Sequence, residues 1–596
     1  MTISALNSEQ LHGAIISGCQ EVIAQKEQLN SINVFPVADS DTGSNMASTA
    51  KAVMSYSSVK AFVNETLQSV AEASLLGARG NSGMIFSQFF NGLSEHVEPK
   101  EQLTLADFNK LLGQAAQSAH QAILSPLDGT MLTIMQTWAN GFNQLTHYKT
   151  SFYDAFQSLL PSLKESVEQT TQTLEALRDT DLVDAGALGF YYFVQGFSKY
   201  LAKPDDRIKP LKSISENLVI NHEAIHSDTP LSYRYCTEAI IKSDAVNKES
   251  LKQFLAQHGD SIVLTGSDKM CRFHLHTDTP GLIFTALMEQ GTIEHPKVDD
   301  MLRQKEAAHH RKAKIALVTD SSADIPSSLK DQHQIHVLPL NMSLGQHQLL
   351  DGYGFAANDF YRKLESLTSY PQTSLPSVGF IQEKLSYLSN HYDEVLVVSI
   401  SQAMSGTYES ILKASDSLKN VHVLNSRMSS ASLGLLVCFA AELIAENKPI
   451  DNILSSLNKA IDETHLFVSL QQVDSMVRSG RISQLSGRLA KISGVKPIIS
   501  IDSDGKGILY DKVFSSKKAL TKLISLTKKQ QSEGKRIYQY SIVHADAENK
   551  ANELAALCTE TFGKPPAYIE PVSAAIGLHA GSGSVALACM LTSDRE

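Results

Sequence analysis

Residues 33–46 read NVFPVADSDTGSNM and place Asp39 and Asp41 two positions apart, immediately before a polar turn. Mg²⁺ in proteins is commonly held by one or two carboxylates, while waters and substrate phosphates complete its octahedral shell. Asn33 offers a further neutral oxygen, and a helix that begins near Ser44 would direct backbone N–H groups toward an anion. The segment therefore predicts either a magnesium and phosphate site or an ordinary Asx turn that caps a helix.

A second glycine-rich segment, GARGNSG at residues 77–83, lies between two apolar stretches with helical spacing. Such a segment can surround a phosphate with backbone donors, or it can simply join two packed helices through a C-cap and an N-cap. It is neither a Walker A loop nor a Rossmann fingerprint, because no Lys-Ser/Thr follows it and no strand precedes it. Similar polar turns occur at residues 128–130 (DGT) and 184–189 (DAGALG). We expect these turns to form one rim of a helical domain.

The length and composition exclude several classes of protein. A chain of 596 residues is too long for one core and predicts three or four domains. Its 52 basic and 63 acidic residues give a formal net charge of -11, which argues against nucleic-acid binding. No apolar run reaches about 18 residues, and the first residues lack a signal-peptide pattern. The 6 cysteines show no disulfide framework, so we expect a cytoplasmic protein without a transmembrane segment.

The periodicity of apolar residues changes along the chain and indicates three domains. Residues 1–205 have helical spacing, with an amphipathic helix expected over residues 7–30. Residues 206–310 alternate short β-like and helical runs and predict a small α/β domain. Residues 311–596 alternate strands, at 315–319, 335–340, 395–400 and 421–424, with helices, which is typical of a βαβ sheet. The fold class is therefore multidomain, with an all-α part followed by two α/β parts.

The middle region contains a group of potential metal ligands. His274 and His276 lie two apart on an expected strand and so point to the same face, and Cys236 lies on an earlier strand. Two imidazoles and a thiolate suit Zn²⁺ with an open fourth position. The alternative is that both histidines form hydrogen bonds in a half-buried sheet and Cys236 packs in the core.

Polar residues of the C-terminal region gather where strands end, which is where ligands bind in open α/β sheets. They lie in residues 317–326 (LVTDSSADIP), in residues 480–483 (GRIS) and at Thr373, Ser374, Ser405, Gly406 and His579. Converging hydroxyls and an imidazole suit a carboxylate or a phosphate, although each residue alone is as well explained as a turn or cap residue.

At this point the N-terminal motifs resemble a known family. The order NVFPVxDxDTGxNM, ARGNSG, GTMLT, VDAGxxG is similar to the ATP-binding domain shared by the bacterial fatty acid kinase and the nucleotide-binding subunit of dihydroxyacetone kinase. The resemblance implies an all-helical barrel that holds ATP and paired Mg²⁺ ions, with Asp39 and Asp41 as catalytic metal ligands. The cofactor-binding positions that it implies are Asn33, Thr42, Ser44, Asn45, Gly80, Asn81, Ser82, Gly83, Thr130, Asp184 and Gly186.

Two further resemblances cover the rest of the chain. YCTE followed by HLHTDTPG resembles the middle domain of the fatty acid kinase, which implies a catalytic metal site at Cys236, His274 and His276. Residues 315–595 resemble the DegV family of fatty-acid-binding proteins, which implies that Thr373, Ser405 and His579 hold an acyl carboxylate with help from the Gly406 backbone. Phe514 stands where many of these carriers have a basic residue, which puts carboxylate binding or docking in question.

These resemblances imply a kinase fused to its carrier. The expected reaction is transfer of the ATP γ-phosphoryl group to a fatty acid carboxylate, giving acyl phosphate and ADP. We also expect a homodimer, transient membrane contact, and engagement of separate carrier or kinase proteins. One alternative is a fatty-acid-binding protein that senses nucleotide without kinase activity. Another, a kinase for a small polyol such as dihydroxyacetone, is disfavoured because the C-terminal half does not resemble the substrate subunit of that enzyme.

Overall fold

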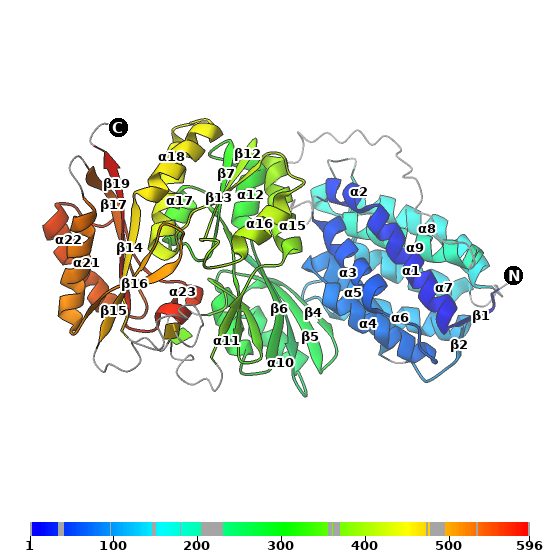
Figure 1. Ribbon diagram of the computed structural model, residues 1–596. Helices are drawn as coiled ribbons and strands as arrows, with labels where there is room; N and C mark the ends of the chain where they lie inside the picture. Colours follow the sequence, from blue (N-terminus) through cyan, green and yellow to red (C-terminus); the bar gives the residue numbers. More distant parts are fainter. Residues whose placement is uncertain are drawn as a thin grey trace. The chain divides into compact units, whose positions relative to one another are not determined.

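The computed structural model describes residues 3–33, 41–95, 97–145, 151–178, 180, 182–203, 231–355, 360–361, 370–471, 475–476, 495–531 and 535–593. The chain forms two compact units, shown in Figure 1. Unit 1 comprises Met1–Thr279 with Leu287–Met301, and unit 2 comprises Pro280–Ala286 with Leu302–Glu596. Two sequence predictions, the metal ligand Asp39 and the GRIS segment at residues 480–483, lie outside the described residues.

The N-terminal part of unit 1 is helical, as the sequence predicts. Its helices are α1 (Ser8–Ala24), α2 (Lys26–Ser31), α3 (Thr42–Tyr56), α4 (Val63–Gly77), α5 (Gly80–Ser94), α6 (Leu105–Gln121), α7 (Met131–Leu145), α8 (Phe152–Thr173), the short 3₁₀ helix η1 (Glu175–Leu177) and α9 (Ala185–Ala202). Two short strands, β1 (Ala5–Asn7) and β2 (Gln102–Thr104), pair antiparallel. The single helix expected over residues 7–30 divides at Gln25, which ends α1 and precedes α2.

An aromatic core holds these helices together. The rings of Phe89 and Trp138 stack with centroids 5.8 Å apart, and those of Phe156 and Phe197 stack at 5.0 Å. These four side chains come from α5, α7, α8 and α9 and are almost fully buried. Each buried aromatic ring removes a large apolar area from water, so this core fixes the mutual positions of the helix ends that form the candidate site.

The remainder of unit 1 is a sheet of antiparallel strands in the order β4-β5-β3-β6. The strands are β3 (Tyr235–Lys242), β4 (Asp260–Gly266), β5 (Met270–Thr277) and β6 (Thr292–Asp300), and α10 (Lys248–Ala256) lies between β3 and β4 in the chain. The small α/β region that the sequence predicts is confirmed. Its register aligns Cys236 with His276 and Glu238 with His274 across the β3–β5 pair.

Unit 2 contains a parallel sheet, β13-β12-β7-β8, which confirms the expected βαβ pattern. Its strands are β7 (Ile315–Asp320), β8 (His336–Leu338), β12 (Glu394–Ser399) and β13 (Val421–Asn425). The described helices of this unit, of which α11 ends and α12 begins at a residue of unit 1, are α11 (Pro280–Leu287), α12 (Met301–His309), α13 (Ser327–Gln332), α15 (Val378–His391), α16 (Thr407–Ser415), α17 (Ser430–Ala445), α18 (Ile450–Asp462), α21 (Ser516–Gln530), α22 (Glu548–Phe562) and α23 (Ala574–Ala580).

A second, mostly antiparallel sheet was not predicted. Within the described ranges it has the order β16-β15-β14-β19-β17-β18. Its strands are β14 (Thr464–Ser469), β15 (Lys496–Ile501), β16 (Gly507–Val513), β17 (Lys535–His544), β18 (Ile569–Pro571) and β19 (Val585–Ser593), and a small sheet joins β9 (Asn341–Leu344) to β10 (His347–Leu350) and β11 (Gln372–Ser374). Helix α17 contacts strands of both large sheets, which explains why its sequence, SASLGLLVCFAAELIA, is apolar on nearly every side.

Two observations concern the cysteines and the lengths of the helices. All six cysteines lie in described segments and none forms a disulfide. Among the helices that the structure describes, none is long and apolar enough to cross a membrane.

Candidate functional site

Two helix N-termini meet beside the first predicted motif. Helix α3 begins directly after Asp41, its N-cap residue, and α5 begins at Gly80. Gly80 has a φ of +55°, and a β-carbon at this position would overlap the side-chain amide of Asn45. Glycine is therefore required at the start of α5, because both the backbone conformation and the close contact with α3 exclude a side chain. The described part of the first predicted segment, residues 41–46, thus lies against the second, residues 77–83.

Two other helices begin at the same end of the helical part. The Asp184 carboxylate accepts hydrogen bonds from the backbone of Ala187, at 2.7 Å, and from Met131, the first residue of α7. A β-carbon at Gly189 of α9 would lie 2.5 Å from the Met46 sulfur of α3. Pairwise contacts therefore connect the N-termini of α3, α5, α7 and α9. The N–H groups at helix N-termini favour the binding of an anion.

The structure shows the local contacts of several predicted residues at this rim, whose nucleotide-binding roles stay predictions. The expected loop at Gly80–Gly83 is instead the first turn of α5. Ser44 is engaged by Asn30, whose Oδ1 accepts its N–H at 2.9 Å and whose Nδ2 donates to its Oγ at 3.0 Å. Thr42 donates to Asn33 Oδ1 at 2.8 Å, which ties Asn33 to the first residue of α3. Thr130 donates to Leu127 O at 2.8 Å.

Burial raises the pKa of Asp184 to about 6, although the hydrogen bonds from Ala187, Gly186 and Met131 oppose that shift. A buried carboxyl that caps α9 and bonds to the start of α7 has a clear structural role. The predicted contacts of Asp184 and Gly186 with a nucleotide stay predictions.

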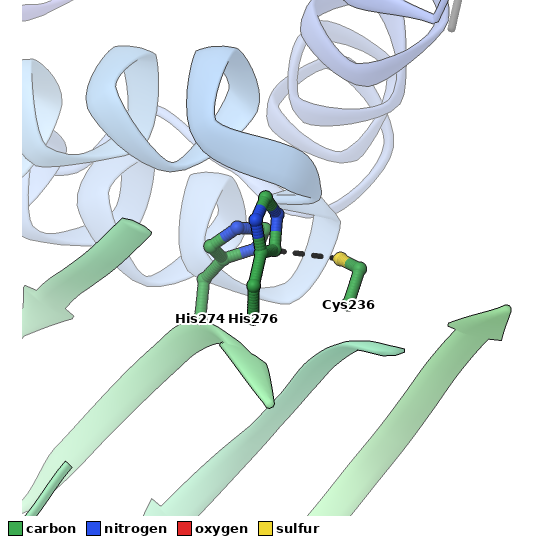
Figure 2. Close-up of side chains that lie close together, drawn as sticks. All are labelled: Cys236, His274 and His276. Carbon is green, nitrogen blue, oxygen red and sulfur yellow. Dashed lines mark hydrogen bonds between the residues drawn. The ribbon is translucent and has the colours of Figure 1, made fainter. Parts of the chain in front are cut away.

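The middle region brings together the three metal ligands that the sequence predicts. One ligand atom from each of Cys236, His274 and His276 lies within 4.8 Å of the others. Figure 2 shows the three side chains gathered above the strands. Cys236 Sγ lies 3.6 Å from His274 Nδ1. Strand periodicity explains the cluster: side chains two apart share a face, and the β3–β5 register sets Cys236 opposite His276.

Glu238 is a fourth member of this group that the sequence analysis missed. Its Oε1 accepts the Gly80 N–H at 2.6 Å and lies 3.1 Å from His274 Nδ1, while its Oε2 accepts from Arg272 Nη2 at 3.2 Å. The side chain is completely buried. Its spacing of two from Cys236 was the available signal, because that spacing places both side chains on one face of the strand.

The protonation states in the cluster follow from burial and from neighbouring charges. Burial raises the pKa of Glu238, but the His274 hydrogen bond and the charges of Lys297 and Arg272 outweigh it and hold that pKa well below its usual value. Burial, with a smaller effect of His274, lowers the pKa of His276 to about 3. The cluster therefore combines an ionised carboxylate with a neutral His276 ring.

Burial also raises the pKa of the Cys236 thiol well above its ordinary value, and the carboxylates of Glu238, Asp299 and Asp41 add to this effect. Asp41 of the helical part is thus close enough to Cys236 to act on it electrostatically. A bound metal ion would reverse the balance, because a coordinating thiol loses its proton.

The donor set fits a metal ion. The carboxylate of Glu238 only accepts, so the Nδ1 of His274 carries the proton in their contact, and a neutral ring then leaves an electron pair on Nε2. That Nε2 is buried and has no hydrogen-bond partner among the residues that the structure describes. Buried polar atoms are nearly always satisfied, so this orphaned nitrogen is best explained as a ligand position.

Unit 2 contains a large cavity where the C-terminal motifs converge. Its volume is about 1280 Å³, and apolar side chains such as Leu466, Ile499 and Val543 form much of its wall. Thr373, Ser405 and His579 all line it. Ser374 and Gly406, also predicted to bind the ligand, are not among its lining residues; Gly406 is the N-cap of α16.

The position of Phe514 clarifies the departure noted in the sequence. Its side chain is 69% exposed and does not line the cavity, whereas Lys512 does. The substitution therefore alters the surface rather than the cavity wall.

The LVTDSSADIP segment contributes mainly structure. Asp324 accepts hydrogen bonds from Ser430 Oγ at 2.5 Å and from Ser573 N at 2.7 Å, and burial raises its pKa to about 7. Asp320 accepts from Ile400 N at 2.8 Å. Of this segment, Ser322 lines the cavity.

Comparisons with known families cover most of the chain. Residues 36–199 match the DAK2 domain, residues 232–308 match the FakA-like middle domain of fatty acid kinase, and residues 314–592 match the DegV family of uncharacterised proteins. One chain therefore combines a DAK2 domain, a FakA-like middle domain and a DegV region.

Several similar curated proteins carry the name uncharacterized protein. One from Staphylococcus epidermidis (strain ATCC 12228) is 26% identical over 56% of this chain and 65% of its own length, and one from Staphylococcus aureus (strain bovine RF122) is 24% identical over 92% and 94%. The chain thus spans just under two thirds of the first of these relatives.

Solved structures similar to part of this chain include a hypothetical protein from Thermotoga maritima, described as revealing a fatty acid binding function. It is 26% identical, with a TM-score of 0.42, over 47% of this chain and 100% of its own. DegV from Bacillus subtilis, described as a fatty acid binding protein, is 25% identical, with a TM-score of 0.43, over the same shares.

Proposed function

We propose that this chain, with its DAK2 domain, fatty acid kinase-like middle domain and DegV region, transfers the γ-phosphoryl group of ATP to a fatty acid carboxylate. The products are an acyl phosphate and ADP. The observation that carries the proposal is the linked set of helix N-termini beside Asp41, with the Cys236 cluster in the same unit.

The nucleotide end rests on electrostatics. N–H groups at the starts of α3 and α5 favour the ATP phosphates, and Asp41, with Asp39 before it in the sequence, supplies carboxylates for Mg²⁺. Phosphoryl transfer depends chiefly on positioning and on neutralisation of the charge on the transferring group. Cys236, His274 and His276 would hold a Zn²⁺ ion, which supplies positive charge when bound.

The acceptor end is the cavity of unit 2. Its apolar wall suits an acyl chain, while Thr373, Ser405 and His579 offer polar groups for the carboxylate. In the reaction a carboxylate oxygen forms a bond to the γ-phosphorus, the bond between that phosphorus and the bridging oxygen breaks, and ADP leaves with the electron pair. Because donor and acceptor belong to one chain, the tether raises the effective concentration of the acyl group, within one chain or between the chains of a dimer.

The test uses the full chain with MgATP and palmitate, with ADP and hydroxylamine-trapped acyl phosphate as the readouts. We expect both products in equal amounts from the natural protein. Asp41→Asn should lose at least about 100-fold in rate, because a metal-holding carboxylate is removed. The matched control is Glu65→Gln, an exposed acidic residue of α4, which should retain full activity.

A different outcome would favour the second candidate, a fatty-acid-binding protein that senses nucleotide. Exposed Phe514, in place of a basic residue, is the observation in favour of that candidate. Bound palmitate and bound ATP without ADP release would identify it, and equal turnover by Asp41→Asn would contradict the kinase assignment.

A further inference from the structure

We propose that Glu238 couples the metal site of the middle region to the nucleotide site of the helical part. This inference rests on the proposed function, since it assigns regulation to the same site. It makes Glu238 a positioning residue that acts through His274 and Gly80.

First, Glu238 uses one oxygen atom, Oε1, for contacts with two different residues. Oε1 of Glu238 accepts the backbone N–H of Gly80 at 2.6 Å and lies 3.1 Å from Nδ1 of His274. Both contacts are buried. If the His274 ring shifts toward a metal ion, Oε1 of Glu238 is drawn with it, and the hydrogen bond from the Gly80 N–H changes.

The second step is the rigidity on either side of that oxygen. Arg272 holds the other carboxylate oxygen through Nη2 at 3.2 Å, and both side chains are almost fully buried. Gly80 is confined by its contact with Asn45 and by its positive φ. Arg272 and Gly80 have little room to relax because both are buried and closely packed. A movement of Glu238 therefore moves the start of α5.

The third step concerns the chemistry of ligand histidines. A histidine that binds a metal through one nitrogen usually donates its other N–H to a carboxylate, and this partner strengthens metal binding. Glu238 meets that description for His274, whose Nε2 is the orphaned atom. The same carboxylate therefore serves the metal ligand and the first turn of α5, which we propose as a phosphate-binding turn.

Coupling of this kind is reciprocal and has a measurable size. Zinc should change the affinity for nucleotide by the same factor by which nucleotide changes the affinity for zinc, commonly about 5- to 150-fold. We expect zinc to tighten nucleotide binding.

The experiment measures the affinity of the full chain for MgADP by calorimetry, zinc-loaded and after removal of zinc with a chelator that spares Mg²⁺. The variants are Glu238→Gln and the matched control Glu294→Gln, whose carboxylate pairs with Lys242 at 2.7 Å on the same sheet. The natural protein and the control should bind MgADP at least about 5-fold more tightly with zinc. Glu238→Gln should show no zinc dependence, and its zinc affinity should fall roughly 10- to 100-fold.

A second measurement covers the case in which Glu238→Gln does not fold. Hydrogen–deuterium exchange of the natural protein should show slower exchange over residues 80–83 when zinc is added. Equal MgADP affinity with and without zinc, unchanged exchange over those residues, or a Glu238→Gln variant with the natural zinc dependence would each overturn the coupling. Failure of every form to bind MgADP would overturn the proposed function as well, so the two failures are distinct.

Discussion

Gly80, the first residue of α5, lies against the side-chain amide of Asn45 on α3, although 34 other residues separate the two in the chain. This contact brings the two glycine-bearing motifs of the helical part together and leaves no space for a β-carbon.

Gly80→Ala should therefore destabilise the protein and weaken nucleotide binding. The added methyl group meets Asn45, and the positive φ disfavours any side chain, so we expect a loss of about 2–4 kcal/mol in unfolding free energy. Denaturant unfolding and MgADP titration measure the two effects. Gly113→Ala is the matched control: it lies on α6 with nothing within 4 Å, and it should gain roughly 0.5–1 kcal/mol.

Zinc binding should depend on Cys236 and not on the nearby Cys271. Cys236→Ala should lose most of its bound zinc, measured by elemental mass spectrometry of the purified chain, because a thiolate ligand is removed. Cys271→Ala is the control, since Cys271 is a buried cysteine that alternates to the opposite face of β5 from His274 and His276. Equal zinc content in the two variants would argue against the assigned ligands.

The polar residues of the cavity should recognise the carboxylate of the fatty acid rather than its acyl tail. Thr373→Val keeps the shape of the side chain but removes a hydroxyl donor to an anion, which typically costs about 1.5–3 kcal/mol, or roughly 10- to 100-fold in affinity. Palmitate binding should weaken by that factor, while binding of palmityl alcohol should change little. Thr521→Val, an exposed substitution on α21, should bind both ligands as the natural protein does. Equal weakening of acid and alcohol would point to a packing defect.

Asp184 predicts a pH dependence of stability. Its pKa is about 6 in the folded protein and near 3.8 otherwise, so the folded state holds a proton that the unfolded state releases between these values. That stabilising contribution is complete below about pH 4 and is lost as the pH rises through 6. Between about pH 5 and pH 7.5 the loss amounts to about 1.4 kcal/mol.

Asp184→Asn removes this titration while keeping a capping side chain. Its unfolding free energy relative to the natural protein should therefore rise by about 1.4 kcal/mol over the same pH interval, measured by denaturant unfolding at both ends. Asp128→Asn, at an exposed position in the same part of the chain, should show no such trend. A constant difference between Asp184→Asn and the natural protein would contradict the assignment.

The local sequence pattern was sufficient to predict much of the fold and the positions of several candidate site residues. Strand β5 and strand β12 were expected within a few residues of their bounds, because alternation and β-branched runs are properties of neighbouring residues. The spacing of His274 and His276 placed both on one face for the same reason. The structure brings Cys236 together with these histidines and lines one cavity with Thr373, Ser405 and His579, while the binding roles of all six residues stay predictions.

Tertiary structure alone decided the rest. The mostly antiparallel sheet pairs β14 with β19, whose residues lie more than a hundred positions apart, and no local pattern specifies such a partner. No motif in the sequence marks Glu238. The β3–β5 register sets it beside His274, and the packing of the sheet against α5 lets its carboxylate accept the N–H of Gly80. Side-chain alternation is encoded by adjacent residues, whereas the sharing of one carboxylate oxygen between distant segments depends on how the packed core brings those segments together.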